Sequence, residues 1–423
     1  MRNLLSLFLG LFFVGAIWPA GAQTPPASSL PDLQIAGPIG ADLFARSGST
    51  GMVFVVVRGN HVFFRGYGET APNSHNVPTD QSVIRLCSLT KIFTADLLVK
   101  NAADKIVQLD DPLQRYAPAH ILVPTRIASG RSATGRVPPI TLEQLATHTS
   151  GLPRELGNGP RGTAHFTFPD YRTRWRWLPN QRLQFTPGTA ALYSNIAYDL
   201  LGDALEAAAH KPLATLLYER TLAPLKMYQT TLFPSAAQCD RLLKSSNDEG
   251  PCTSTEETAG SSGLYSTAAD MEIMLKYLLG TGAPAIPAQD PTAQADQLLV
   301  ASLKGERGLD HAGIPTSIGL GWLRLLPADN PSTIIEKTGG GAGYTTYIAI
   351  SQARHTAIFL AATDGPADTH FNLFKGANNA LLSLAGLPPM PPEPVHTLAR
   401  PGHKHGKIPR SAHKSKTSSS PLS

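Results

Sequence analysis

Ser88-Leu89-Thr90-Lys91 stands where an apolar, strand-like run ends and a helical pattern of apolar residues begins. A serine and a lysine at this spacing lie on one face of a helix, one turn apart. The helix N-terminus favours negative charge near the serine oxygen. A lysine amine that loses its charge through burial can accept the serine proton. The stretch therefore predicts Ser88 as a nucleophile and Lys91 as its base.

The chain contains a control for this pattern, because Ser411-Ala412-His413-Lys414 has the same spacing. That copy lies in a polar tail without an apolar helical stripe. Ser88 instead follows a hydrophobic run and opens a helix with an apolar face, which makes it the stronger candidate.

Tyr193-Ser194-Asn195 is the second candidate element. A phenol with a pKa near ~10 acts as a base only if cations stabilise the phenolate, and Lys91 and Lys337 would be those cations. Asn195 would present its amide to the substrate backbone. The alternative is that Tyr193 is a half-buried aromatic with a hydrogen-bonded hydroxyl. Ser245-Ser246-Asn247 has a related pattern in a polar loop and ranks lower.

Lys337-Thr338-Gly339-Gly340-Gly341-Ala342-Gly343 is the third element, between two strand patterns. Glycines beside a strand indicate that another backbone comes close, and a peptide substrate could add there as a strand. The N–H groups of Gly340 and Ser88 would form an oxyanion hole, in which each donor is typically worth ~100-fold to 1,000-fold in rate. Lys337, Thr338 and Gly339 complete this candidate site. The alternative is an ordinary glycine-rich turn.

The order of strand and helix patterns predicts an α+β fold. Valine- and phenylalanine-rich runs at 52–58 and 61–67 flank Gly59-Asn60, a hairpin signal. Strand patterns return at 319–325, 332–337, 344–350 and 356–363, and the region between is mainly helical, including a helix over 265–279 capped by Ser266 or Thr267. We therefore expect an antiparallel sheet from both termini, flanked by helices (30–90 and 260–387), with an inserted helical lobe (91–259) and the site between lobes.

Both ends of the chain differ in composition from the body. Arg2, an apolar run and Ala20-Gly21-Ala22 predict a secretory signal peptide over 1–22, and failed cleavage would leave an anchor. The catalytic domain would cover 23–387. Residues 388–423 are proline-rich, then basic and serine-rich, which predicts disorder. We expect an exported, periplasmic protein, with membrane association if the signal segment is retained as an anchor.

The charge distribution argues against a nucleic-acid partner. The formal net charge is +5, but six basic residues lie in the tail and Arg2 in the signal, so the body is slightly acidic. It has no basic nucleic-acid-binding signature. The tail could contact a wall or membrane surface electrostatically. No metal or cofactor motif is present, and the sequence does not reveal the oligomeric state.

Three cysteines are present. Cys239 and Cys252 are close in a polar segment of an exported chain, so we predict a disulfide between them, worth ~3 kcal/mol in the chain-entropy model. Cys87, beside Ser88, is either a reactive thiol or a small residue buried under the helix, and burial is the more ordinary state.

Two further features each have a catalytic and a structural interpretation. His148 could be a base, although a histidine at such a junction is more often a structural hydrogen-bonding residue. The segment 166–182 mixes aromatic residues with arginines and could bind glycans or carboxylates. A helix that packs between lobes with its arginines reaching solvent is the stronger interpretation.

Taken together, these motifs resemble the serine β-lactamase and penicillin-binding protein superfamily, in its class C β-lactamase-like branch. The resemblance covers about 51–387 and includes Leu109–Pro112, Leu145–Leu152, Thr186–Gly188, Pro224–Met227 and Ser262–Thr267. Within the branch, Phe64–Thr70, the cysteine pair and the glycine run are most similar to the AmpH-type D-alanyl-D-alanine carboxypeptidase/endopeptidases. Cys87 and the basic tail depart from the family pattern.

The resemblance implies a β-lactamase/transpeptidase-like fold and an acyl-enzyme on Ser88. Lys91 and Tyr193 would transfer protons, and Lys337 would meet a substrate carboxylate. Asn195, Thr338 and Gly340 would line the acyl site. The expected activity is an exported, penicillin-binding D,D-peptidase on peptidoglycan stem peptides, with β-lactams as further ligands. The alternatives are a class C-type β-lactamase or small-ester hydrolase with the same site, and a non-catalytic wall-binding or β-lactam-sensing protein.

Overall fold

The computed structural model describes residues 32–128, 137–247, 249–281, 294–365 and 369–392. Contacts divide the chain into one unit that ends at Met390 and a second from Pro391 to Ser423. The predicted signal peptide and most of the predicted tail lie outside the described residues, as does Ser411–Lys414. The domain boundaries at 22 and 387 stay predictions.

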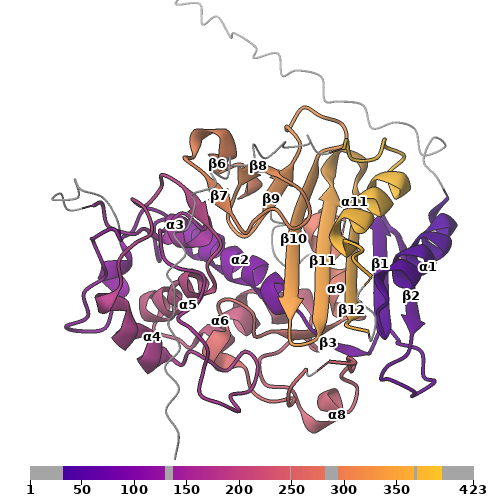
Figure 1. Cartoon of the computed structure of the whole chain (residues 1–423), viewed down its shortest axis with the longest axis horizontal. Coiled ribbons are helices and arrows are strands. Elements are labelled where there is room, and N and C mark those ends of the chain that lie inside the picture. Colours follow the sequence, from indigo (N-terminus) through magenta and orange to yellow (C-terminus); the bar gives the residue numbers. More distant parts are fainter. Residues whose placement is uncertain (1–31, 129–136, 248, 282–293, 366–368, 393–423) are drawn as a thin grey trace, which may run out of the picture. The chain divides into compact units, whose positions relative to one another are not determined.

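An eight-stranded sheet forms the frame of the first unit (Figure 1). Every neighbouring pair in it is antiparallel. The strand order brings together segments far apart in the sequence, because the hairpin at 51–68 pairs with the strand at 356–363. In spatial order the strands are β2 (His61–Gly68), β1 (Gly51–Arg58), β12 (Thr356–Thr363), β11 (Tyr344–Ser351), β10 (Ile334–Gly341), β9 (Leu323–Leu325), β8 (Pro315–Ile318) and β6 (Leu298–Leu299).

The central strands are apolar on both sides because helices cover both faces. In β1, the side chains of Val53, Val55 and Val57 join one core, whereas those of Met52, Phe54 and Val56 join the other. This alternation follows from the two-residue period of a strand. The first core also contains residues of α2 (Thr90–Ala103) and α9 (Ala268–Leu278). The second contains residues of α1 (Ala36–Ser47) and α11 (Leu373–Leu384).

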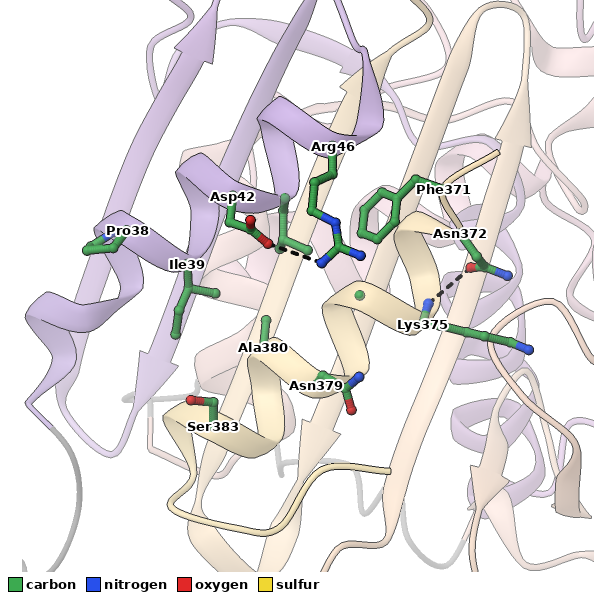
Figure 2. Close-up of a pocket in the computed structure, with 12 residues that line it drawn as sticks. Pro38, Ile39, Asp42, Arg46, Phe371, Asn372, Lys375, Asn379, Ala380 and Ser383 are labelled. Carbon is green, nitrogen blue, oxygen red and sulfur yellow. Dashed lines mark hydrogen bonds and ion pairs between the residues drawn. The ribbon is translucent and has the colours of Figure 1, made fainter. Parts of the chain in front are cut away.

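Helices α1 and α11 pack side by side over the second core and leave a groove of about 630 Å³ between them (Figure 2). Arg46 pairs with Asp42, and its guanidinium carbon lies 4.2 Å from the centre of the Phe371 ring. None of the predicted catalytic residues lines this groove.

The middle of the chain is mainly helical, as predicted. Its helices are α2, α3 (Leu142–Ala146), α4 (Tyr171–Trp177), α5 (Asn195–Ala209), α6 (Leu213–Leu217), the π-helical turn η6 (Tyr218–Leu222), α7 (Ala223–Leu225) and α8 (Ala236–Cys239). Two short sheets lie outside the main one, β3 (Val83–Arg85) with β5 (Tyr265–Thr267), and β4 (Ala191–Leu192) with β7 (Glu306–Arg307). Short 3₁₀ turns are η2 (Leu33–Ile35), η3 (Cys87–Leu89), η4 (Leu113–Tyr116), η5 (Leu178–Asn180), η7 (Glu256–Thr258), η8 (Val300–Ser302) and η9 (Gln352–Arg354).

Several predicted elements differ from the observed ones in their boundaries, and two of them show the physical reason. The helix predicted over 265–279 begins as strand β5, and α9 starts only after Thr267, whose side chain accepts from Asp270 N. The strand predicted over 319–325 is confined to β9, because Gly321 has a φ of +82° and forms a turn. Pairing with β3 outweighs the residue pattern in the first case, and the local backbone conformation of Gly321 does so in the second.

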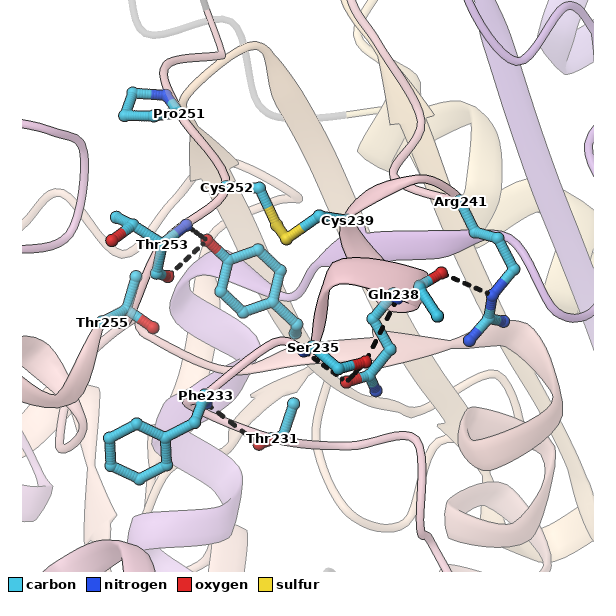
Figure 3. The surroundings of a disulfide bond; sticks show 12 residues. Thr231, Phe233, Ser235, Gln238, Cys239, Arg241, Pro251, Cys252, Thr253 and Thr255 are labelled. Carbon is cyan, nitrogen blue, oxygen red and sulfur yellow. Dashed lines mark hydrogen bonds between the residues drawn. A yellow bond between two sulfur atoms is a disulfide. The ribbon is translucent and has the colours of Figure 1, made fainter.

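The predicted disulfide between Cys239 and Cys252 is present (Figure 3). It joins the end of α8 to an extended segment that contacts the strand leading to Ser88. The carbonyl oxygen of Pro251 accepts from Arg85 Nη2 at 2.8 Å. Tyr265, on the partner strand, donates to Thr253 O at 3.0 Å. The disulfide therefore tethers the segment that supports β3.

Candidate active site

Ser88 sits in the 3₁₀ turn η3 between strand β3 and helix α2. This confirms the strand-to-helix transition that the sequence predicts. The preceding residue, Cys87, has a φ of +51°. A left-handed backbone costs a non-glycine residue ~1–2 kcal/mol, and such strain is characteristic of functional sites. The strand and the helix thus hold Ser88 at a sharp change of chain direction.

Cys87 itself is fully buried, and its sulfur lies 3.4 Å from Gly341 O. Burial raises the pKa of this thiol to about 12. Because the thiolate is the reactive form, this cysteine is chemically inert near neutral pH. The structure favours the interpretation of Cys87 as a small buried residue.

Lys91 is completely buried, with three oxygen atoms around its amine. Its Nζ lies 2.6 Å from Asn195 Oδ1, 2.7 Å from Ser261 O and 3.3 Å from Ser88 Oγ. A neutral amine has two N–H donors and one lone pair. Asn195 and Ser261 offer acceptors for the two donors, which leaves the lone pair for the Ser88 hydroxyl.

Burial is also the main influence on the charge of Lys91. It lowers the pKa of the amine to about 7, although the carboxylates of Asp199 and Glu155 act in the opposite direction. A substantial fraction of Lys91 is therefore uncharged at neutral pH. The amine can accept a proton without any metal or histidine.

Tyr193 completes the arrangement around the serine oxygen. Its hydroxyl donates to Ser88 Oγ at 2.6 Å. The residue follows β4, and its N–H donates to Arg307 O at 3.0 Å. The next residue, Ser194, caps α5 by accepting from Ala197 N, so the start of that helix fixes the position of the ring.

The expectation that cations would turn Tyr193 into a phenolate is wrong in direction. Lys337 and Arg154 do lower its pKa, but desolvation by burial is larger, and the net effect raises the pKa above its ordinary value. Tyr193 is thus a hydrogen-bond donor near neutral pH. Of the two residues predicted to transfer protons, Lys91 is the one whose pKa burial brings close to neutrality, and the assignment of the base stays a prediction.

Lys337 lies on β10 with its Nζ 5.2 Å from the centre of the Tyr193 ring. Burial lowers its pKa, and the nearby Lys91 acts in the same direction. In the part of the chain that the structure describes, its amine makes no hydrogen bond, so its donors stay available to a ligand. Next to it, Thr338 is half-buried and Gly340 is exposed.

Gly339 brings strand β10 against the turn that holds Ser88. A Cβ atom at this position would lie 2.9 Å from Leu86 O and 3.2 Å from Ser88 N, and it would also overlap the Thr346 hydroxyl. Only glycine permits so close an approach, which explains the glycine that follows Thr338. The oxyanion hole of Ser88 and Gly340 stays a prediction.

Asn195 has a different environment from the one predicted. Its Oδ1 accepts from Lys91, and its Nδ2 donates to Glu155 Oε1 at 2.5 Å. Its amide therefore connects the lysine to an exposed carboxylate, and its predicted contact with substrate stays a prediction. Sequence reasoning missed Glu155 and its neighbour Arg154, although only Pro153 separates this charged pair from the segment Leu145–Leu152.

For both His148 and the segment 166–182, the structure favours the structural interpretation over the catalytic one. His148 is buried, its Nδ1 accepts from Ser194 N at 3.1 Å, and its ring lies 4.6 Å from that of Tyr193. Desolvation holds the pKa of His148 well below its usual value. In α4, Arg174 is buried and paired with Asp203 through two hydrogen bonds, rather than reaching solvent as expected.

The comparison with known proteins agrees with this geometry. The model of the Beta-lactamase family matches residues 41–377. The chain belongs to the beta-lactamase family. Among its relatives, D-alanyl-D-alanine-carboxypeptidase/endopeptidase AmpH of Escherichia coli K12 is 39% identical over 356 residues, which cover 82% of this chain and 88% of the relative.

Solved structures of the beta-lactamase family confirm the predicted fold. A beta-lactamase/D-alanine carboxypeptidase from Yersinia pestis, in complex with citrate, is 38% identical with a TM-score of 0.75 and covers 84% of this chain and 99% of that one. A class C beta-lactamase from Rhodobacter sphaeroides is 20% identical with a TM-score of 0.61, covers 83% and 98%, and shows the fold alone. Among the described residues, no cluster of three or more metal-ligating side chains is present.

Gly339 and Gly340 provide a matched test of how closely β10 approaches the Ser88 turn. A methyl group at Gly339 meets backbone atoms of the Ser88 turn, whereas one at Gly340 comes no nearer than 3.7 Å to another described atom, Tyr344 O. Chemical denaturation should show that Gly339→Ala lowers the free energy of unfolding by about 1–3 kcal/mol. Gly340→Ala should change it by less than ~0.5 kcal/mol. Equal effects would contradict this account of the glycines.

Proposed function

We propose that this chain is an exported, penicillin-binding serine D,D-peptidase. It removes the terminal D-alanine from peptidoglycan stem peptides, or cuts D-alanyl cross-links, through an acyl-enzyme on Ser88. The observation that carries this proposal is the Ser88 oxygen held between the amine of Lys91 and the hydroxyl of Tyr193. The names of the Escherichia coli and Yersinia relatives support D-alanyl peptides as the substrate class.

Acylation begins with attack of Ser88 Oγ on the carbonyl carbon of the scissile amide. The Ser88 proton moves to the lone pair of neutral Lys91, and the tetrahedral oxyanion is held by the N–H groups of Ser88 and Gly340. As the C–N bond breaks, the leaving amine receives the proton from Lys91. The hydrogen bond from Tyr193 keeps the serine oxygen aligned for attack.

Deacylation uses the same groups in reverse. A water molecule gives its proton to neutral Lys91 as its oxygen attacks the ester carbon. The bond from Ser88 Oγ to the acyl carbon then breaks, and the proton returns to the serine. Since Lys91 is neutral again at the end of the cycle, one base serves both half-reactions.

Lys337 is suited to bind the carboxylate at the end of the substrate. Its amine makes no hydrogen bond to any of the described residues, and it lies beside the Tyr193 ring. Thr338 and Gly339 continue the same strand, and Gly340 is exposed next to them. A stem peptide that adds along β10 would place its terminal carboxylate near Lys337.

Export is part of the proposal, and it rests on the signal-like residues 1–22. Along the described stretches of the chain, no helix is both long and apolar enough to cross a membrane. We place the enzyme in the periplasm, with the basic tail as a possible electrostatic contact to wall or membrane. The disulfide accords with an oxidising compartment.

Product analysis tests the activity directly. The mature protein and its Ser88→Ala variant are incubated with pentapeptide monomers and with D,D-cross-linked dimers, and products are identified by mass spectrometry. We expect loss of one alanine or splitting of dimers with the wild type only, and covalent penicillin labelling only when Ser88 is present. Labelling of the variant would refute Ser88 as the nucleophile. Turnover of a chromogenic cephalosporin without peptide turnover would favour the β-lactamase alternative.

The pH dependence of acylation tests Lys91 as the base. Only the neutral amine accepts the proton, so the second-order labelling rate should rise with pH and level off above a pKa of about 7. Asp199 raises the pKa of Lys91, so Asp199→Asn should move the rising limb to lower pH. Asp110→Asn removes the same charge from an exposed position and should leave the limb in place.

The variant Tyr193→Phe distinguishes between Lys91 and Tyr193 as the base. If Lys91 is the base, this variant keeps the rising limb and loses ~100-fold of the plateau rate, because the serine oxygen loses the hydrogen bond that aligns it. Disappearance of the limb in Tyr193→Phe, with its persistence in Lys91→Met, would instead identify the tyrosine as the base.

A further inference from the structure

Arg154 lies at the exposed edge of the catalytic cluster. Its guanidinium carbon is 4.8 Å from the centre of the Tyr193 ring, and the side chain is 54% exposed. Its backbone position is fixed, because its carbonyl oxygen accepts from Asn195 N at 2.9 Å. The residue therefore presents a cation to solvent directly beside the groups around Ser88.

The guanidinium of Arg154 makes no hydrogen bond to any residue in the described stretches. Its Nε forms an ion pair with Glu155 Oε1 at 3.8 Å, a separation too long for a hydrogen bond. The same oxygen accepts from Asn195 Nδ2, which holds Glu155 in place. Arg174 and Arg324 show the contrast, since each guanidinium is bonded to both oxygens of an aspartate.

A guanidinium with free donors has a definite preference for ligands. Its planar fork matches the two oxygens of a carboxylate, and a fixed position reduces the entropy lost on binding. The aromatic ring beneath it stabilises the cation and orients the fork. The arrangement is thus a preformed half of an arginine–carboxylate pair.

We propose that Arg154 binds a second carboxylate of the substrate, carried by the residues that precede the scissile bond. The inference rests on the proposed function, in which Lys337 takes the terminal carboxylate. In the carboxypeptidase reaction the leaving D-alanine has only that one carboxylate, so any other belongs to the part that stays on Ser88. The enzyme therefore selects acyl donors with an acidic side chain over neutral ones.

The test uses two penicillins that differ in one carboxylate. Benzylpenicillin and its α-carboxy derivative share the ring system, and the extra carboxylate lies on the part that remains attached to Ser88. Second-order labelling rates are measured for the wild type and for Arg154→Gln, Arg154→Lys and Arg172→Gln. The readout is the ratio of the rate for the carboxy derivative to that for benzylpenicillin.

Arg154→Gln should lower this ratio about tenfold, as expected for a charge-assisted hydrogen bond to a partly exposed carboxylate. Arg154→Lys keeps the charge without the planar fork, so its ratio should lie between those of the wild type and Arg154→Gln. Arg172, exposed on α4, is the matched control, and its variant should keep the wild-type ratio. The ratio also cancels the effect of Arg154 on the pKa of Lys91, because both penicillins meet the same base.

An unchanged ratio in Arg154→Gln, or an equal change in Arg172→Gln, would overturn the proposal. Peptide hydrolysis plays no part in this readout. The ratio can therefore support or refute Arg154 whether or not the protein proves to be a D,D-peptidase.

Discussion

The buried amine of Lys91 is the interaction on which the rest of the site depends. Water is excluded from it, so its charge is costly and its pKa falls towards neutrality. Asn195 Oδ1 and Ser261 O accept hydrogen bonds from the amine, which leaves its lone pair for Ser88. A more exposed lysine would remain protonated, and the serine would have no base.

The fold supplies this environment from segments far apart in the sequence. The amine receives its partners from the start of α5 and from the loop before β5, while β10 passes close to the Ser88 turn. The sheet is pinned by the pairing of β1 with β12, which joins the two ends of the catalytic unit. Tethering by the disulfide adds support behind β3. The chemistry therefore needs the whole unit rather than a local motif.

Sequence patterns were sufficient where the controlling interactions are local. The Asn-containing turn and the valine- and phenylalanine-rich runs beside it predict β1 and β2, and the spacing of Ser88 and Lys91 places them on one helical face. The direction of the Tyr193 pKa shift was not predictable, because it depends on how much water burial removes relative to the effect of nearby cations. Glu155 and Arg154 were missed since their contacts with Asn195 and Tyr193 arise only in the folded chain. The start of α9 was misplaced because pairing with β3 keeps Tyr265–Thr267 extended.

The charge of Lys91 in the resting enzyme is the central claim, and a nuclear magnetic resonance titration measures it directly. Protein labelled with ¹³C at the lysine ε-carbons is titrated, and the signal absent from a Lys91→Met variant is assigned to Lys91. We predict a midpoint at a pKa of about 7, separated from the exposed lysines. A midpoint near the ordinary lysine pKa of ~10.4 would show a charged amine at neutral pH and contradict the account.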